Sequence, residues 1–448
     1  MNKKLKIILP LFVVIIVAGI VAVLFLINFG ERDTIQPNFF KTIDDQSFGN
    51  SFAIDGDGNL YIGTSHKQRW QAEGGTWSEH YYLYSFHPNN TLRWQFETNN
   101  SEVIKSDPVV HPYEDLVFFV SESYSSINTN PFPLPNTTYN KVYAINRDDG
   151  SLNWSSGKLA KDITDNNWGS NCLEMAIDSN GYIYAQSQHN ITSFHANGTL
   201  RWKNDTMSEQ FNYAGSVAIF DDTIYFTSGE THYLYILAFY TNGTFKWKYE
   251  LYQFNGNNRF NMISFDENGK IYVGSENSSS SSTDNVCFYA INPDGTQDWN
   301  FTISTRYAKV RGNVAIDNDG TIYLGTKNND NSEFYALNSD GTLKWKYDGQ
   351  LQDVYSAPTI ADDGSVFFAT EDDFIYRLNK ANGQLRNRYQ LHTDVTHSSC
   401  TFDDDGTLYI GDLGGHLYAI ELGTISLANT PWPCLGANFM RTRFMNPA

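Results

Sequence analysis

From about residue 50 onwards, short runs of alternating hydrophobic and polar residues recur along the chain in a two-part unit. The clearest copy reads AIDNDGTIYLG over Ala315–Gly325 and FYALNSDGTLKWKY over Phe334–Tyr347. An alternation with a period of two residues is typical of half-buried strands. Seven further copies align with it, among them AIDGDGNLYIG with LYSFHPNNTLRWQF, and the chain therefore carries eight repeats.

Each repeat predicts four short antiparallel strands. A small apolar strand leads through an Asp-Gly or Asn-Gly turn to an alternating strand such as Thr321–Gly325. A variable loop, the strand Phe334–Leu337, a second such turn and a tryptophan-bearing strand follow. These turns favour hairpins because both central residues need a positive φ. Eight units of four antiparallel strands specify an all-β, eight-bladed β-propeller.

One tryptophan occupies the same outer-strand position in six of the repeats. We expect it to fill the wedge between adjacent blades, where its large apolar area contributes most to stability. These blade-core tryptophans are Trp94, Trp154, Trp202, Trp247, Trp299 and Trp345.

The two ends of the repeat region predict how the ring closes. The eighth repeat lacks its tryptophan strand, and the segment FFKTI, Phe39–Ile43, precedes the first repeat where such a strand would fall. We expect this segment to complete the last blade and so remove an exposed edge. The propeller is then predicted over residues 31–423, with residues 424–448 as an extension packed on its outside or over one face.

The first thirty residues predict a membrane anchor. Lys3, Lys4 and Lys6 precede a run of 23 uncharged residues, 7–29, which is long enough to cross a bilayer as one transmembrane helix. A cleaved signal peptide is the alternative, although no small-residue cleavage site follows the run. The positive-inside bias predicts a single-pass protein with a cytoplasmic N-terminus and an extracytoplasmic propeller.

Composition narrows the classes of function. The 448 residues include 50 Asp and Glu against 31 Lys and Arg, for a formal charge of −19, so the chain would repel a phosphate backbone. The aromatic content of 15% excludes a disordered protein. Four dispersed cysteines without a CxxC pair argue against a zinc ribbon or a disulfide-dense scaffold.

The pattern DGxxYxG, a YALN-like strand and DGTLKWK resembles the quinoprotein-type, or PQQ-like, repeat. The resemblance covers about residues 39–422, and the tail segment Thr430–Phe444 resembles a Trp-Pro-containing segment found beside such propellers. The family includes quinoprotein alcohol dehydrogenases and BamB-like envelope assembly lipoproteins. The resemblance therefore implies an eight-bladed propeller, and either a redox enzyme or an assembly factor.

The enzymatic members are similar to one another in an adjacent Cys-Cys disulfide over the quinone, a calcium site and a catalytic Asp. This chain has no adjacent cysteines, its nearest pair being Cys400 and Cys434, and it has no CxxCH haem motif. No Asp matches the catalytic motif. We therefore expect no catalytic residue and no cofactor, and a quinone-dependent dehydrogenase stays as an alternative.

Three carboxylate turns, beginning at Asp55, Asp317 and Asp403, resemble the first half of a calcium loop. A complete loop needs a further carboxylate near its twelfth position. Residues 61–72 and 323–329 contain no Asp or Glu. We expect these carboxylates to stabilise hairpin turns, with calcium binding as the alternative and no metal site predicted.

The loops after each second strand and between blades vary in length, and they should share one face, the variable face. Binding residues usually lie on such loops. Aligned positions at the start of the inner strands should also ring the central channel on this face. Aromatic side chains that only plug the channel are the alternative. The residues predicted to bind a partner are Trp70, Trp77, Trp168, Tyr213, Phe260, Arg311, Tyr355 and His397.

Ten Asn-x-Ser/Thr sequons make N-glycosylation a prediction for an extracytoplasmic domain. They begin at Asn89, Asn99, Asn136, Asn153, Asn190, Asn197, Asn204, Asn242, Asn277 and Asn300. Together these features predict a membrane-anchored, non-catalytic binding or scaffold propeller with a protein or glycan partner and no nucleic acid. A BamB-like envelope assembly factor is a further alternative.

Overall fold

A computed structural model describes most of the chain between residues 14 and 445. It describes residues 14–17, 20–23, 34–35, 37, 39–43, 46–64, 80–98, 102–126, 135–157, 159, 174–187, 190–205, 213–229, 233–252, 262–275, 286–303, 308–310, 312–328, 332–395, 398–438 and 441–445.

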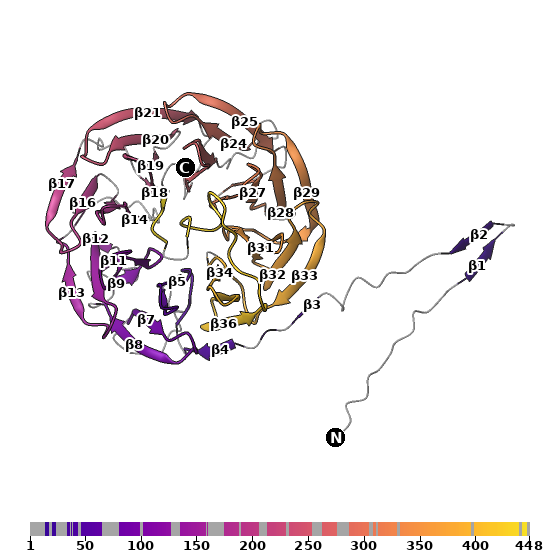
Figure 1. Cartoon of the computed structure of the whole chain (residues 1–448), viewed down its shortest axis with the longest axis horizontal. Coiled ribbons are helices and arrows are strands. Elements are labelled where there is room, and N and C mark those ends of the chain that lie inside the picture. Colours follow the sequence, from indigo (N-terminus) through magenta and orange to yellow (C-terminus); the bar gives the residue numbers. More distant parts are fainter. Residues whose placement is uncertain are drawn as a thin grey trace, which may run out of the picture.

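Eight antiparallel sheets radiate from a common centre, as Figure 1 shows, and this confirms the predicted eight-bladed propeller. Blade 1 contains β5 (Ala53–Ile54), β6 (Leu60–Gly63), β7 (Tyr82–Phe86) and β8 (Leu92–Glu97). Blade 2 contains β10 (Val109–Val110), β11 (Leu116–Ser126), β12 (Pro135–Asn146) and β13 (Leu152–Ser155), with β9 (Glu102–Ile104) paired to β11. Blade 3 contains β14 (Met175–Ile177), β15 (Ile183–Gln186), β16 (Ile191–Phe194) and β17 (Leu200–Asn204), and blade 4 contains β18 (Tyr213–Phe220), β19 (Thr223–Gly229), β20 (Tyr233–Tyr240) and β21 (Phe245–Tyr252). Blade 5 contains β22 (Ser264–Phe265), β23 (Ile271–Gly274), β24 (Val286–Ile291) and β25 (Gln297–Ile303), and blade 6 contains β26 (Ala315–Ile316), β27 (Ile322–Gly325), β28 (Ser332–Leu337) and β29 (Leu343–Leu351). Blade 7 contains β30 (Thr359–Ile360), β31 (Ser365–Thr370), β32 (Phe374–Asn379) and β33 (Leu385–Gln390). Blade 8 contains β34 (Thr401–Phe402), β35 (Thr407–Gly411), β36 (His416–Glu421) and the N-terminal strand β4 (Phe39–Thr42).

The N-terminal strand closes the ring as predicted. β4 pairs antiparallel with β36, with His416 opposite Thr42 and Tyr418 opposite Phe39. The preceding strand β3 (Thr34–Ile35) pairs parallel with β33 on the outer edge of blade 7. Blade 8 is therefore built from both ends of the repeat region, so its outer strand joins covalently to blade 1.

The transmembrane helix predicted over residues 7–29 is not confirmed. Within that segment the structure describes β1 (Val14–Val17) and β2 (Ile20–Val23), which pair as an antiparallel hairpin. The other residues of the segment lie outside the described part of the chain. None of the described residues belongs to an apolar helix long enough to span a bilayer.

The six tryptophans of the outer strands join blades 1 to 6 each to the next blade. Trp345 is 9% exposed, and its indole N–H donates to the backbone oxygen of Lys380 in blade 7 at 2.9 Å. A Cβ on Gly383 in the same turn would lie 2.5 Å from the Trp345 ring, and Gly383 has a φ of +70°. Glycine is required there by the close approach and by the positive φ. The equivalent indole bonds reach the backbone oxygens of Arg147, Ala196, Thr241, Pro293 and Ser339.

Replacing Trp345 by Ala should therefore destabilise the fold by about 3–5 kcal/mol, as for other large-to-small core changes. Leu343 lies two residues away on the same strand and is 49% exposed. Leu343→Ala is thus the matched control and should change stability by less than about 0.5 kcal/mol. Urea unfolding of the two variants would measure the difference. Equal midpoints would show that the indole does not hold the blades together.

Deleting residues 31–45 should lower the melting temperature by several degrees, because blade 8 would lose β4 and expose the edge of β36. A deletion of residues 31–36 removes β3 and spares β4, so it should have the smaller effect. Thermal unfolding followed by circular dichroism makes the comparison. An unchanged melting temperature in the longer deletion would mean that the ring closes without the N-terminal strand.

Candidate functional site

The C-terminal tail crosses the centre of the propeller between the innermost strands, as Figure 1 shows. Its backbone pairs with those strands next to their first turns. Ile316 and Trp432 exchange backbone hydrogen bonds of 2.8 and 3.3 Å, and β37 (Phe444–Met445) pairs parallel with β18. The Ile177 amide donates to the Thr442 oxygen at 2.9 Å. The tail was expected outside or over one face, and in this structure it pairs with the innermost strands next to their first turns.

Two buried arginines of the tail reach several blades. Arg441 is 1% exposed and donates to the backbone oxygens of Phe52 and Leu435 at 2.8 and 2.7 Å, and to the Thr401 hydroxyl. Burial lowers the pKa of Arg441, while the charge of Asp107 opposes that shift. These contacts join the tail to blades 1 and 8.

Arg443 extends the same arrangement to blades 2, 3 and 4. Its guanidinium lies 2.6 Å from the Glu174 carboxylate and 4.0 Å from that of Asp107, and it donates to the Ser216 hydroxyl at 3.4 Å. Arg443 itself is 1% exposed. Sequence reasoning missed these arginines, because each occurs once and its partners lie in distant repeats.

Replacing Arg443 by Ala should cost about 3–5 kcal/mol of stability, because Glu174 and Asp107 would remain buried without their counter-ion. Arg386→Ala is the control, since its ion pair with Asp363 is partly exposed and such pairs contribute at most about 1 kcal/mol. Chemical denaturation would report both values. Similar losses in the two variants would contradict a special role for the central ion pair.

Of the eight residues predicted to bind a partner, Trp70, Trp77, Trp168, Phe260, Arg311 and His397 lie outside the described residues. Tyr213 is the first residue of β18, and Tyr355 precedes β30. The two therefore lie at the same end of their inner strands. Lys327 donates to the Tyr355 hydroxyl and lies 4.6 Å from its ring centroid, while Asp353 pairs with Lys327 at 2.6 Å.

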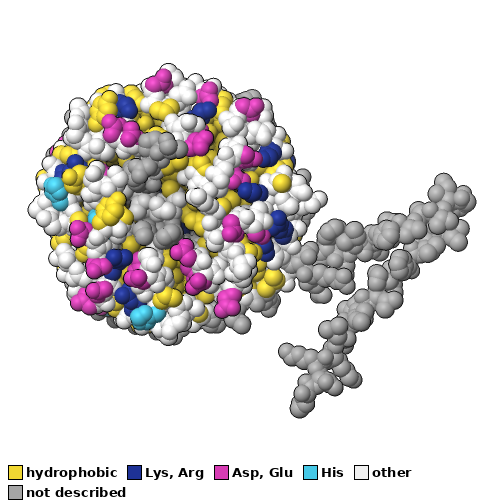
Figure 2. All heavy atoms as spheres, viewed as in Figure 1, with side chains coloured by type: hydrophobic (Ala, Val, Ile, Leu, Met, Phe, Trp, Pro, Cys, Tyr) yellow, Lys and Arg dark blue, Asp and Glu magenta, His cyan; other side chains and the backbone are white. Residues whose placement is uncertain are grey.

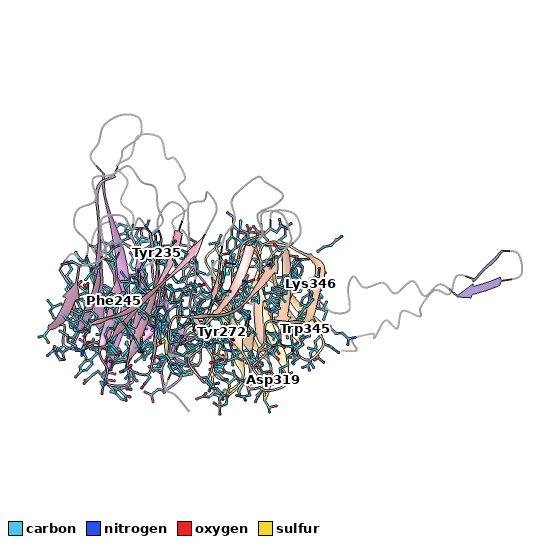
Figure 3. The ribbon with its side chains drawn as sticks, turned by 90° about the horizontal axis from the view of Figure 1, so that it is seen from above. Tyr235, Phe245, Tyr272, Asp319, Trp345 and Lys346 are labelled. Carbon is cyan, nitrogen blue, oxygen red and sulfur yellow. The ribbon has the colours of Figure 1, made fainter. Side chains whose placement is uncertain are left out.

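The short turns after the first and third strands of each blade lie on the opposite face, the turn face. Figure 3 shows Asp319 at this edge of the ring, with Trp345 and Lys346 progressively farther from it. In blade 1, the Asp55 carboxylate accepts hydrogen bonds from the amides of Asp57 and Asn59 and from the Tyr61 hydroxyl, at 3.0, 2.8 and 2.7 Å. Asp403 makes the same three bonds within blade 8. The Asp55 and Asp403 carboxylates thus stabilise their turns, whereas Asp317 accepts from the Asn318 amide and pairs with Lys380 at 2.7 Å. That these turns bind no calcium stays a prediction.

A cleft of about 690 Å³ opens on the turn face between blades 5 and 6. Figure 2 shows acidic side chains distributed over this face among hydrophobic ones. The cleft is bounded by the Trp299 indole and by Pro431 of the tail. Its lining residues are Asp266, Glu267, Asn268, Lys270, Asp298, Trp299, Asp317, Asn318, Asp319, Gly320, Ser339, Asp340 and Pro431.

Lysines pair with some of these carboxylates, but the cleft keeps an excess of negative charge. Lys344 lies 2.9 Å from Asp319, and Lys270 lies 2.7 Å from Asp298. Burial alone would raise the pKa of Asp319, but hydrogen bonds from Thr321 and Lys344 lower it to about 2. The cleft carboxylate of Asp319 therefore stays charged at every physiological pH.

The described residues at the centre of the turn face do not fit the quinone cofactor that the family resemblance implies. Cys400 and Cys434 are buried free thiols. Burial raises the pKa of Cys400 to about 12 and that of Cys434 to about 11, so both are neutral at pH 7. Trp432 and the two arginines occupy the centre at this face. Among the described residues, no group of three His, Cys, Asp or Glu side chains is arranged to hold a metal ion.

The sequons fall into distinct environments. Asn190 is 2% exposed and its Nδ2 donates to the Leu159 oxygen at 2.8 Å, so a glycan there is incompatible with this fold. Asn204 is half-buried, and its Nδ2 donates to the Gly243 oxygen. Asn136 lies in β12, whereas Asn99 and Asn277 lie outside the described residues. The exposed sequon asparagines are Asn89, Asn153, Asn197, Asn242 and Asn300.

Comparison with known proteins places the fold. A family model described as "Outer membrane protein assembly factor BamB" matches residues 283–427. The crystal structure of BamB from Moraxella catarrhalis is similar with a TM-score of 0.54 and 13% identity, over 86% of this chain and 99% of that chain. The computationally designed Ika8 protein is similar with a TM-score of 0.53 and 12% identity, over 88% of this chain and 100% of that chain. No curated protein matches the sequence. Over residues 283–427 the family match confirms the PQQ-like repeat predicted from the sequence.

Proposed function

We propose that this β-propeller of PQQ-like repeats is a non-catalytic scaffold that binds a protein partner on its outer surfaces. The observation that carries the proposal is the tail in the centre. Arg441 and Arg443 are buried there and bonded to groups of five blades. The central space at the turn face is therefore part of the core, and binding falls to the exposed turns and loops.

The acidic cleft between blades 5 and 6 is the proposed docking site for a cationic segment of that partner. Asp319 and Asp340 present carboxylates whose pKa values are lowered, that of Asp340 by hydrogen bonds from Thr342. Trp299 also lines the cleft and adds apolar surface for the aliphatic part of a Lys or Arg side chain. A protein of charge −19 also attracts a basic partner at long range.

The variable face is the second proposed surface, for a protein or a glycan. Its predicted residues, including Trp70 and Trp77, belong to an insertion that the repeat does not require. Exposed aromatic side chains are common anchors of interfaces. Binding on this face stays a prediction.

We also propose that residues 7–29 anchor the chain in a membrane, with the N-terminus in the cytoplasm and the propeller outside. The 23 uncharged residues behind three lysines support this orientation. The family match to an assembly factor favours a role in assembly at a cell envelope. This chain would be held there by its hydrophobic segment, since no lipidated cysteine follows that segment.

The test is capture of partners by the full-length chain from detergent-solubilised membranes of its source organism. Asp319→Lys combined with Asp340→Lys should reduce recovery of the partner at least about tenfold, because both charges facing the cationic segment are reversed. Asp149→Lys is the matched control, since Asp149 occupies the same turn position in blade 2 and caps Ser151 as Asp340 caps Thr342. Recovery should also fall with rising salt.

Loss of recovery only in Trp70→Ala and Trp77→Ala would move the site to the variable face. Dye-linked dehydrogenase activity after addition of quinone and calcium would overturn the non-catalytic proposal. Recovery of glycans without protein would overturn the protein partner.

A further inference from the structure

We infer that His111 makes the contact between blades 2 and 3 sensitive to pH, because the hydrogen bonds at this position require a neutral imidazole. His111 follows β10, begins the turn that leads to β11 and is 2% exposed. Its ring packs against Phe118 of β11, with the ring centroids 6.0 Å apart. The proposed scaffold function does not use His111.

Hydrogen bonds define which nitrogen of the ring carries the proton. The backbone amides of Tyr113 and Glu114 donate to Nδ1 at 3.2 and 2.9 Å. Because an amide only donates, Nδ1 is the unprotonated, accepting nitrogen. Nε2 lies 3.0 Å from the backbone oxygen of Gly181, in the facing turn of blade 3. Because a carbonyl only accepts, Nε2 carries the proton, and both nitrogens of the neutral ring are used.

A second proton on the ring would break these contacts. It would bind to Nδ1, where its hydrogen would face the two amide hydrogens of the turn, and both amides would lose their acceptor. The charged ring would also be buried, and burial penalises the charged form of a histidine. The ring must therefore leave its position when it is protonated, and the bond to Gly181 of blade 3 is then lost as well.

The charged groups around the ring do not compensate for its burial. Burial lowers the pKa of His111, and the charge of Arg147 lowers it further, whereas the charges of Glu114 and Asp178 and the bond to the Gly181 oxygen raise it. Arg147 itself pairs with the exposed Asp115 at 2.7 Å. Among the described residues, no carboxylate is hydrogen-bonded to the His111 ring. An imidazolium here would thus be a buried charge without a counter-ion.

The corresponding turn of blade 3 has an aspartate in the place of His111. The Asp178 carboxylate accepts from the amides of Asn180 and Tyr182, at 2.9 Å each. A carboxylate accepts in its charged form, whereas Nδ1 of an imidazole accepts only while it is unprotonated. Histidine normally takes up its proton at a pH about two to three units higher than aspartate does. Mild acid should therefore remove the acceptor of blade 2 and leave that of blade 3 in place.

Acid favours the open form of the turn at His111. In the open turn the ring reaches water and regains its ordinary pKa of about 6.5, whereas in the closed turn the pKa is lower. The stabilisation of the closed turn is then complete above about pH 6.5 and declines as the pH falls toward the pKa of the closed state. Trp154 holds the same pair of blades by its bond to the Ala196 oxygen at 2.7 Å. Opening should therefore be confined to the turn.

The experiment is hydrogen–deuterium exchange of the full-length chain in detergent at about pH 7.5 and about pH 5.0, corrected for the intrinsic effect of pH on exchange. The protection of the Tyr113 and Glu114 amides should fall at least about threefold at the lower pH, because opening is coupled to the uptake of a proton. The Asn180 and Tyr182 amides of blade 3 are the matched control and should keep their protection.

His111→Asp should abolish the pH dependence in this range, since it introduces the acceptor that blade 3 uses. His87→Asp makes the same change of residue at an exposed histidine of blade 1 and should leave the loss of protection as in the unmodified chain. The comparison of the two turns within the unmodified chain needs no variant to fold. Unchanged protection of the Tyr113 and Glu114 amides, an equal loss in the turn of blade 3, or a retained pH dependence in His111→Asp would each overturn the role of His111.

Discussion

The structure depends on how a ring of radial sheets satisfies the backbone groups at its centre. The innermost strand of each blade has one edge facing the axis, and buried backbone groups need hydrogen-bond partners. Several of these strands are only two residues long, such as β26 and β30. The tail supplies partners at this edge, bonding to Ile316, to Ile360 through Pro433 and Ala428, and to Ile219 through Arg443. The backbone groups at the inner edges of these blades are thus satisfied by the tail as well as by the blades themselves.

The central arginines make that packing specific. Burying a guanidinium is costly unless an opposite charge and hydrogen bonds compensate for the lost water. Arg443 meets Glu174 and Asp107, whereas Arg441 meets two backbone oxygens and the Thr401 hydroxyl. Shifting the tail along the axis would separate each guanidinium from its own set of partners. The tail therefore has one favourable register, and the polar groups at the axis are used within the fold.

Features that recur in several repeats could be predicted from the sequence, whereas contacts of residues that occur once could not. The Asp-Gly or Asn-Gly turns and the outer-strand tryptophans occur in several repeats. The hairpins and the packing of a tryptophan between adjacent blades could therefore be predicted from this sequence alone. Arg441 occurs once and binds the oxygen of Phe52, 389 residues away, which no periodicity reveals. The helix predicted from the hydrophobic run of residues 7–29 is not confirmed, and the described residues of that run pair as β1 and β2. Six of the eight residues predicted to bind a partner lie outside the described residues, so their role stays a prediction.

The seam between blades 7 and 8 differs from the six seams that contain a tryptophan. At every seam with a tryptophan, the indole donates to a turn between the third and fourth strands of the next blade. Blade 8 has no such turn, because its fourth strand β4 comes from the other end of the chain. A tryptophan in β33 would have no turn to bond, and Asn387 occupies the position instead, with its side chain bonded to Tyr389. This seam must be held by other contacts. The His392 amide donates to the Tyr418 hydroxyl and the Gly414 amide donates to the Thr393 hydroxyl, and these bonds link the segment after β33 to blade 8. The break in the repeat that ring closure requires thus replaces the indole bond of the six tryptophan seams with polar contacts of other residues.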